Sequence, residues 1–485
     1  MSLASLAMCS VFLWSPDSGF HPDEETYLAV SLEMFRTGNW LVPRLELEPV
    51  FFKPPLLYWL QCTSFAVFGP SLAAARLPSL LGTLGLAALT SRLPREATDE
   101  TRLRLFLVVL SSVAALRFGA LAMMDPLFSL ALLGAAVCTA RVPRGLLAAA
   151  ACVALAILLK GPVGAVLGFG VVVLSAWQHQ RRFSAGMILA AFALTAALVV
   201  PWYALMAQRF GAEFWDKFLV REHLGKLGAI NLPINFALNL LFVAIATAPA
   251  WLLGINFKPV DGWRGGWFVA LFVAAYSLQT SRQLHYYLPV VPFAALHCTF
   301  GENRPGPRRA FLFALALSSA AGGALLVSAG QRIAGVLFFG LTAALVAAGL
   351  RPVGPRATVL AVLVTWTAAV GLAPRLLFPP SWPSTLSAST GGEPVAIIGR
   401  DPGVLALATG VDVHRAPART ISGRPGLLWI APAAQCRDAG ATTVASWSRL
   451  GERAPAATVW RAVASASVEP LLEAWELCRE RPAAP

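Results

Sequence analysis

Two short runs decide how this chain is interpreted: Asp23-Glu24-Glu25-Thr26-Tyr27 and, about thirty residues later, Phe51-Phe52-Lys53-Pro54-Pro55. They place carboxylates and a lysine in the first polar stretch of a chain that is otherwise apolar. Charge at a membrane surface that solubility does not require points to a functional site. The rest of the sequence shows whether a membrane surface is the right setting.

The composition is that of a membrane protein with many spans. Of 485 residues, 57% are hydrophobic and 13% are charged, and the mean hydropathy is +0.66. Soluble proteins carry roughly 25% charged residues. The net charge of +13 lies mainly in short loops between apolar segments. Positive-inside topology therefore explains it better than nucleic-acid binding, which we do not expect.

Apolar runs predict about 13 transmembrane helices, the first being residues 2–14, which lack a basic leader and so are not expected to be a cleaved signal. The predicted spans are 2–14, 71–91, 103–122, 124–140, 145–159, 162–177, 184–206, 234–255, 266–280, 284–299, 309–328, 331–349 and 357–377. Alternate connections between the apolar runs differ in charge, and the set that is rich in arginine is predicted to face the cytoplasm. The sparse polar residues then gather at the opposite, outer ends of the helices.

Three segments are predicted to lie in the membrane interface rather than to cross it. These are 23–36, 56–68 (behind the helix-starting Pro54-Pro55 pair) and 213–224. Residues 1–380 thus form a membrane domain. Residues 383–485 have a different composition and predict a small outer α/β domain, with strands at 395–398, 427–430 and 458–460 and a helix over 469–480.

The seven cysteines show no metal-ligand spacing. Cys436 and Cys478 both lie in the C-terminal domain, where a disulfide between them is one option. The other five cysteines fall in apolar segments, where cysteine usually acts as a small hydrophobic residue.

Further runs join the first two in resembling a known family. They are Gly38-Asn39-Trp40-Leu41-Val42-Pro43-Arg44, Ala75-Arg76-Leu77-Pro78-Ser79, Met124-Asp125, Lys160-Gly161-Pro162, Glu222-His223, and Arg282 with Tyr287-Leu288-Pro289. Together they resemble the polytopic glycosyltransferases of the GT-C fold, and within them the aminoarabinose lipid A transferases and the protein-mannosyltransferase-like group. The resemblance covers most of the membrane domain.

The resemblance implies an inverting transferase in a bacterial inner membrane, with its active site on the periplasmic face. Such enzymes move a sugar from a polyprenyl-phosphate donor to a lipid, glycan or protein acceptor. Asp23 and Asp125 match the family's acidic catalytic positions. Lys53, Lys160 and Arg282 match its phosphate-binding cations, and Tyr27 and Tyr287 are further substrate-binding candidates. Cations suit a leaving phosphate, and a carboxylate suits an acceptor that must lose a proton.

Each of these residues also has a structural interpretation. Asp23 could cap the helix that follows, Asp125 could cap its own helix, and the lysines could reach headgroups from helix ends. His223 is a candidate metal ligand with Glu222, a hydrogen-bond partner, or an interfacial histidine. No cofactor is required by the reaction; a divalent metal is an option.

Two positions depart from the aminoarabinose-type pattern. Thr26 stands where many members have arginine, and Phe52 where many have a glutamate associated with a metal site. The sugar and the acceptor therefore do not carry over. Two rival functions stay open: a flippase for a lipid-linked sugar, which would need polar groups through the membrane depth, and a degenerate family member acting in binding or assembly.

Overall fold

The structure, a computed structural model, describes most of the first 297 residues and part of the C-terminal region. The described ranges are 21–45, 48–141, 145–227, 232–248, 260–279, 281–297, 395–398, 413–416, 428–432, 442–450 and 472–479, with a few single residues between 320 and 436. The predicted spans at 2–14 and 357–377, the predicted strand at 458–460, and nearly all of the spans at 309–328 and 331–349 lie outside these ranges.

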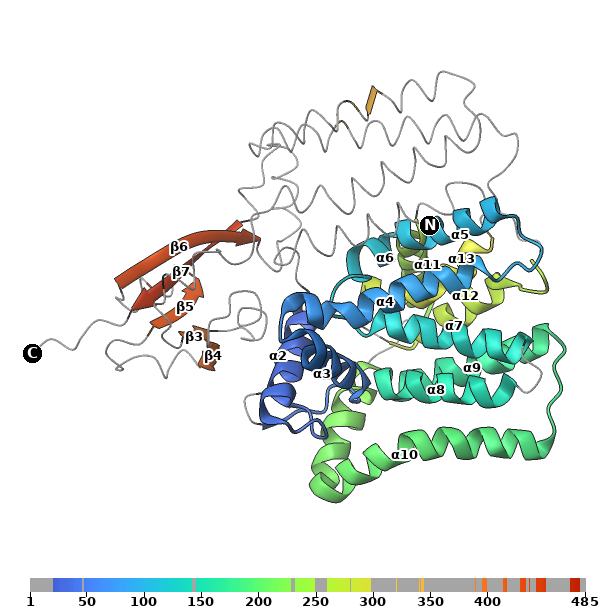
Figure 1. Cartoon of the computed structure of the whole chain (residues 1–485), viewed down its shortest axis with the longest axis horizontal. Coiled ribbons are helices and arrows are strands. Elements are labelled where there is room, and N and C mark those ends of the chain that lie inside the picture. Colours follow the sequence, from blue (N-terminus) through green and yellow to red (C-terminus); the bar gives the residue numbers. More distant parts are fainter. Residues whose placement is uncertain are drawn as a thin grey trace, which may run out of the picture.

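Helices make up the described part of the membrane domain (Figure 1). The α-helices are α2 (Pro22–Thr37), α3 (Leu56–Phe68), α4 (Leu72–Ser91), α5 (Asp99–Ser111), α6 (Val113–Phe118), α7 (Asp125–Arg141), α8 (Gly145–Lys160), α9 (Pro162–Gln178), α10 (Ala185–Trp215), α11 (Leu232–Thr247), α12 (Gly265–Ser277) and α13 (Val291–Ala295). Three irregular helical turns, η1 (Asp216–Arg221), η2 (Leu224–Lys226) and η4 (Leu284–Val290), and two short strands, β1 (Arg44–Leu45) and β2 (Glu48–Pro49), complete this part.

By length and composition, α4 and the run Ala185–Lys226 could each cross a membrane. Five shorter apolar helices accompany them among the described residues: α3, α8, α9, α11 and α12. The core lies where α7 packs against α4, α8 and α9. The predicted interfacial segments in the first loop are observed as α2 and α3, which lie at one end of the longer helices (Figure 1).

Two predicted spans are wrong as continuous helices. The prediction at 103–122 divides into α5 and α6, because Ser112 adopts an extended conformation and its hydroxyl caps α6 by accepting the Ala115 N–H. The prediction at 284–299 becomes a 3-10 turn followed by the short α13. Pro289 has no N–H to donate, which disfavours a regular α-helix at that point, and Pro292 lies in the first turn of α13, where proline is tolerated.

The long helix α10 bends at Gly211, where φ is +53° and ψ is −129°. Residues with side chains rarely adopt this conformation, so a glycine suits it. The bend separates the apolar run from the π-helical turn η1 and the 3-10 turn η2. The interfacial segment predicted at 213–224 therefore begins just after the helix bends at Gly211.

The charged loops separate in space as the sequence predicts. The Arg141 guanidinium, at the end of α7, donates to the backbone carbonyls of Arg92 and Leu93, which follow α4. Asp125 and Lys160 lie at the opposite ends of α7 and α8. The arginine-bearing loops thus meet at one end of the bundle and the candidate site residues at the other.

The described C-terminal residues form a five-stranded sheet in the order β4-β3-β5-β7-β6. The strands are β3 (Val395–Ile398), β4 (Val413–Ala416), β5 (Leu428–Pro432), β6 (Thr442–Leu450) and β7 (Leu472–Arg479). Strand β3 is parallel to β4 and β5, whereas β7 is antiparallel to β5 and β6. The strands predicted at 395–398 and 427–430 are observed.

The helix predicted over 469–480 is wrong, since these residues contain β7. Strand β7 pairs along both edges, so pairing with its neighbours outweighs the local preference for a helix. Cys436 is buried and disulfide-bonded. The side chain of Cys478 lies outside the described ones, so its pairing with Cys436 stays a prediction.

Candidate active site

Asp23 lies in the first turn of α2. The N-cap is His21, whose Nδ1 accepts the Asp23 N–H at 3.2 Å. Asp23 therefore is not the residue that caps the helix, and its carboxylate, 32% exposed, is available for another role. Its neighbour Glu24 is fully buried and accepts from Arg76 at 2.8 Å and 3.1 Å and from the Ala122 N–H at 2.7 Å. Adjacent carboxylates thus have different environments.

Asp125 and Lys160 form a buried ion pair between the start of α7 and the end of α8. The Lys160 Nζ donates to the Asp125 Oδ1 at 2.5 Å and lies 5.0 Å and 4.9 Å from the centres of the Phe128 and Tyr286 rings. The side chains of Lys160 and Asp125 are only 9% and 2% exposed. Lys160 therefore does not extend toward lipid headgroups, which was its alternative structural interpretation. The pair holds two candidate site residues in one place.

Lys53 follows the β1–β2 turn and pairs with Glu222, which also accepts from Lys226 at 2.6 Å. Burial lowers the pKa of Lys53, and the Glu222 carboxylate opposes that shift. Burial alone would raise the pKa of Glu222, but the ammonium groups of Lys53 and Lys226 outweigh it and lower that pKa. The Glu222 carboxylate thus contacts two ammonium groups at once.

His223 lies beside this cluster. Its Nδ1 is 2.6 Å from the Phe218 carbonyl oxygen, and burial lowers its pKa, which favours the neutral ring. Among the described residues, no third carboxylate, histidine or cysteine joins Glu222 and His223 in a group of metal-ligand atoms. Their proposed metal role therefore gains no support from the geometry.

A cavity of about 260 Å³ lies beside several of these residues, although neither Asp23 nor Asp125 is among those that line it. Its polar lining includes Lys53, Lys160, Lys226, Glu222, His223, Gln279 and Tyr286. The rest of its wall is largely apolar and comes from α9, α12 and the 219–227 segment, with Val166, Leu167, Leu219 and Leu278 among its residues. An apolar space with lysines in its wall suits a lipid that carries an anionic head.

Arg282, Tyr287 and Tyr27 are not among the described lining residues. The Arg282 guanidinium bonds Asn235 and the Tyr287 hydroxyl bonds Asn239, both on α11. Tyr27 is buried and its ring lies 6.2 Å from that of Tyr58, while burial and the Asp23 charge raise its pKa. These three predicted binding residues therefore do not line the cavity, and their binding role stays a prediction.

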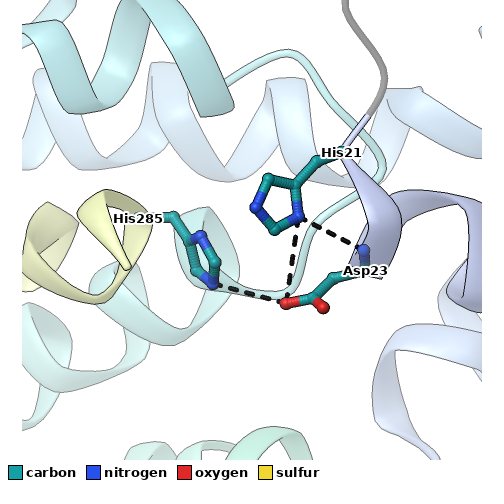
Figure 2. Close-up of side chains that lie close together, drawn as sticks. All are labelled: His21, Asp23 and His285. Atoms are coloured by element: carbon teal, nitrogen blue, oxygen red, sulfur yellow. Dashed lines mark hydrogen bonds and ion pairs between the residues drawn. The ribbon is translucent and has the colours of Figure 1, made fainter. Parts of the chain in front are cut away.

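His285 lies between the two candidate catalytic carboxylates. Its Nε2 lies 3.6 Å from the Asp23 Oδ2 and 4.0 Å from the Asp125 Oδ2 (for Asp23, Figure 2). Sequence reasoning missed His21, His285, Tyr286 and Lys226. The available signals were the histidine before Pro22-Asp23, the His285-Tyr286 pair beside Tyr287, and a lysine four residues after Glu222.

Comparison with solved structures identifies the fold. The crystal structure of ArnT from Cupriavidus metallidurans bound to undecaprenyl phosphate superimposes with a TM-score of 0.71, covering 97% of this chain and 96% of that one at 16% identity. The chain has the GT-C fold of ArnT. The resemblance found in the first loop is therefore confirmed, together with a helical, polytopic membrane architecture.

Sequence comparison agrees, while no protein-family model matches. An uncharacterized protein of Aquifex aeolicus is 31% identical over 280 residues, covering 55% of this chain and 64% of that protein. An undecaprenyl phosphate-alpha-4-amino-4-deoxy-L-arabinose arabinosyl transferase of Serratia proteamaculans is 27% identical over 327 residues, covering 61% and 57%. The chain thus matches less than two thirds of the length of these relatives.

Proposed function

We propose that this protein is a membrane glycosyltransferase that takes a sugar from a polyprenyl-phosphate donor and places it on a lipid, glycan or protein acceptor. The observation that carries the proposal is the cavity, whose largely apolar wall holds Lys53, Lys160 and Lys226. The candidate carboxylates lie behind Lys160, which pairs with Asp125, and His285 lies between Asp125 and Asp23. A relative named for an undecaprenyl-phosphate sugar and an ArnT structure bound to undecaprenyl phosphate support the choice of donor.

The charges explain how the donor phosphate would bind. Lys160 has Asp125 as its counter-ion, while Lys53 and Lys226 both contact the carboxylate of Glu222. A phosphodiester carries one negative charge, which ammonium groups in the cavity wall would attract. Charge-assisted bonds of this kind are among the stronger ones in proteins. The apolar wall would hold the first part of the polyprenyl chain.

The same groups would assist the transfer. The acceptor oxygen forms a bond to the anomeric carbon as the bond from that carbon to the phosphate oxygen breaks. The electron pair leaves with the polyprenyl phosphate, whose added negative charge the lysines stabilise. The acceptor proton passes to a carboxylate, for which Asp23 is the candidate because it is partly exposed and free of any lysine or arginine within 4.0 Å among the described residues.

The acceptor would be reached from the outer, periplasmic side of a bacterial inner membrane. This orientation rests on the separation of the arginine-bearing loops from the site and on the positive-inside rule. Thr26 and Phe52 depart from the aminoarabinose-type pattern, so the proposal does not fix aminoarabinose as the sugar or lipid A as the acceptor.

Binding of undecaprenyl phosphate to the purified protein tests the proposal first. Lys53→Ala should weaken binding at least tenfold, whereas Lys217→Ala should not. Lys217 is a matched control because it is an exposed lysine of the same segment, paired with Glu213 and outside the cavity lining. Equal binding by the two variants would contradict the proposal. Movement of a lipid-linked sugar across vesicles without any glycosyl product would favour the flippase instead.

A further inference from the structure

His21, Asp23 and His285 form a compact group of ligand atoms (Figure 2). One ligand atom from each residue lies within 4.8 Å of the others, and this is the only such group of three or more among the described residues. The two histidines come from different parts of the chain: His21 caps α2 and His285 lies in η4. Their rings lie 5.0 Å apart, and both pack edge-on against Phe118.

The spacings do not fit hydrogen bonds. The Asp23 Oδ2 is 3.9 Å from the His21 Nδ1 and 3.6 Å from the His285 Nε2. Hydrogen bonds between nitrogen and oxygen are about 2.7–3.2 Å long. Two ligands of one tetrahedral zinc ion, each about 2.0–2.1 Å from the metal, lie roughly 3.4 Å apart. The observed separations are therefore close to those of atoms that share an ion.

His285 gives an independent indication. It is 1% exposed, and its Nδ1 is buried with no hydrogen-bond partner. Its other nitrogen, Nε2, is the one that faces the Asp23 and Asp125 carboxylates. A metal on Nε2 would hold the ring in this orientation, beside the two carboxylates.

The neighbouring charges leave Asp23 free to bind a cation. Lys160 is paired with Asp125 and Lys53 with Glu222. Among the described residues, the basic groups within 4.0 Å of the Asp23 carboxylate are the two histidines. Imidazole ligands favour zinc and similar transition metals over magnesium or calcium.

We propose that His21, Asp23 and His285 bind one divalent transition-metal ion of the zinc class, with the His21 Nδ1 exchanging the Asp23 N–H that it accepts for the metal. Three protein ligands leave at least one position open, as in catalytic rather than structural zinc sites. The open position would receive an oxygen of the acceptor. This metal site is separate from the Glu222–His223 pair. It rests on the proposed function and deepens it, because Asp23 belongs both to the metal site and to the proposed active site.

Metal content tests the inference without any transfer assay. The full-length protein is stripped with a chelator, incubated with Zn²⁺ or Co²⁺, desalted and analysed for metal and for the visible spectrum of bound Co²⁺. We expect about one ion per chain in the wild type. His285→Ala and His21→Ala should each weaken binding at least tenfold and alter the cobalt spectrum, whereas His223→Ala should change neither.

His21→Ala serves as the second variant because His21 is partly exposed, so its loss disturbs the core less than the loss of His285. Absence of bound metal in the folded wild type would overturn the inference. So would metal that persists in both histidine variants but disappears in His223→Ala. Because binding of undecaprenyl phosphate is measured separately, failure of the metal site and failure of the proposed transferase are distinguishable.

Discussion

The Lys160 ammonium lies 2.5 Å from the Asp125 carboxylate, and both side chains are buried between α7 and α8. Asp125→Ala leaves a buried lysine without its counter-ion, which typically destabilises a fold by about 3–5 kcal/mol. We expect a corresponding fall in the free energy of unfolding, measured by denaturant titration in detergent.

The double variant Asp125→Leu/Lys160→Met separates stability from function. Replacing a whole buried ion pair with apolar residues is often neutral or stabilising, so unfolding should return close to the wild-type value. Sugar transfer should be absent, because the cavity has lost the Lys160 cation and the site has lost the Asp125 carboxylate. Recovery of transfer in the double variant would show that the pair is structural only.

Gly161 sets the distance between Lys160 and the 216–223 segment. Its φ is +56°, and a Cβ there would lie 2.8 Å from the Phe218 Cζ and 3.2 Å from the His223 Nε2. Strained backbone of this kind costs a residue with a side chain about 1–3 kcal/mol. Gly161→Ala should therefore lower stability and weaken undecaprenyl-phosphate binding several-fold.

Gly186→Ala is the control for that variant, since nothing lies within 4 Å of its added Cβ. Its stability and binding should equal or exceed those of the wild type, because alanine favours helices. Unchanged binding in Gly161→Ala would show that the 216–223 segment does not control the cavity.

The pKa of Glu222 predicts a pH dependence. Two ammonium groups lower this pKa below that of a free glutamate, despite burial. The ionised carboxylate therefore stabilises the fold at pH values above about 4.3, and this contribution disappears as the pH falls through the lowered folded-state value. The difference in unfolding temperature between wild type and Glu222→Gln should be largest near neutrality and should vanish in acid.

Thermal unfolding in detergent from pH 7 to pH 3 measures that difference. Glu213→Gln is the control, since its exposed pair with Lys217 contributes little at any pH. A difference for Glu222→Gln that stays constant with pH would contradict the assignment of its charge.

Glu24 and Arg76 form a buried pair with a structural role, which the first-loop sequence does not distinguish from that of Asp23. Arg76→Met leaves Glu24 buried without its cation, so we expect destabilisation of about 3–5 kcal/mol. Asp23→Asn should change unfolding much less, since Asp23 is partly exposed. Similar losses in the two variants, measured by the same denaturant titration, would contradict this division of roles.

The sequence predicted the elements whose signals are local. Pro54-Pro55 marked the start of α3, and the apolar runs marked α4, α8, α9 and the first part of α10. The predictions failed where a single side chain or tertiary pairing decides the outcome. Ser112 divides one predicted span into two helices, and pairing on both edges makes 472–479 a strand.

The sequence predicted those site residues that carry a charge in an otherwise apolar chain. Lys53, Lys160, Asp125 and Glu222 were all identified and are brought together. Partners were not predictable, because no spacing in the sequence shows that Glu222 meets Lys53 or that Arg282 meets Asn235. His285 was missed for the same reason, since its significance comes from Asp23, more than 250 residues away.

Transfer by wild type and Asp23→Asn tests the central claim most directly. Both purified proteins receive a panel of undecaprenyl-phosphate sugars and membrane-extract acceptors, and glycosylated product and released undecaprenyl phosphate are measured beside thermal unfolding. The account predicts product from the wild type and none from a folded Asp23→Asn. Equal product from both would contradict the assignment of Asp23 and move the active site elsewhere.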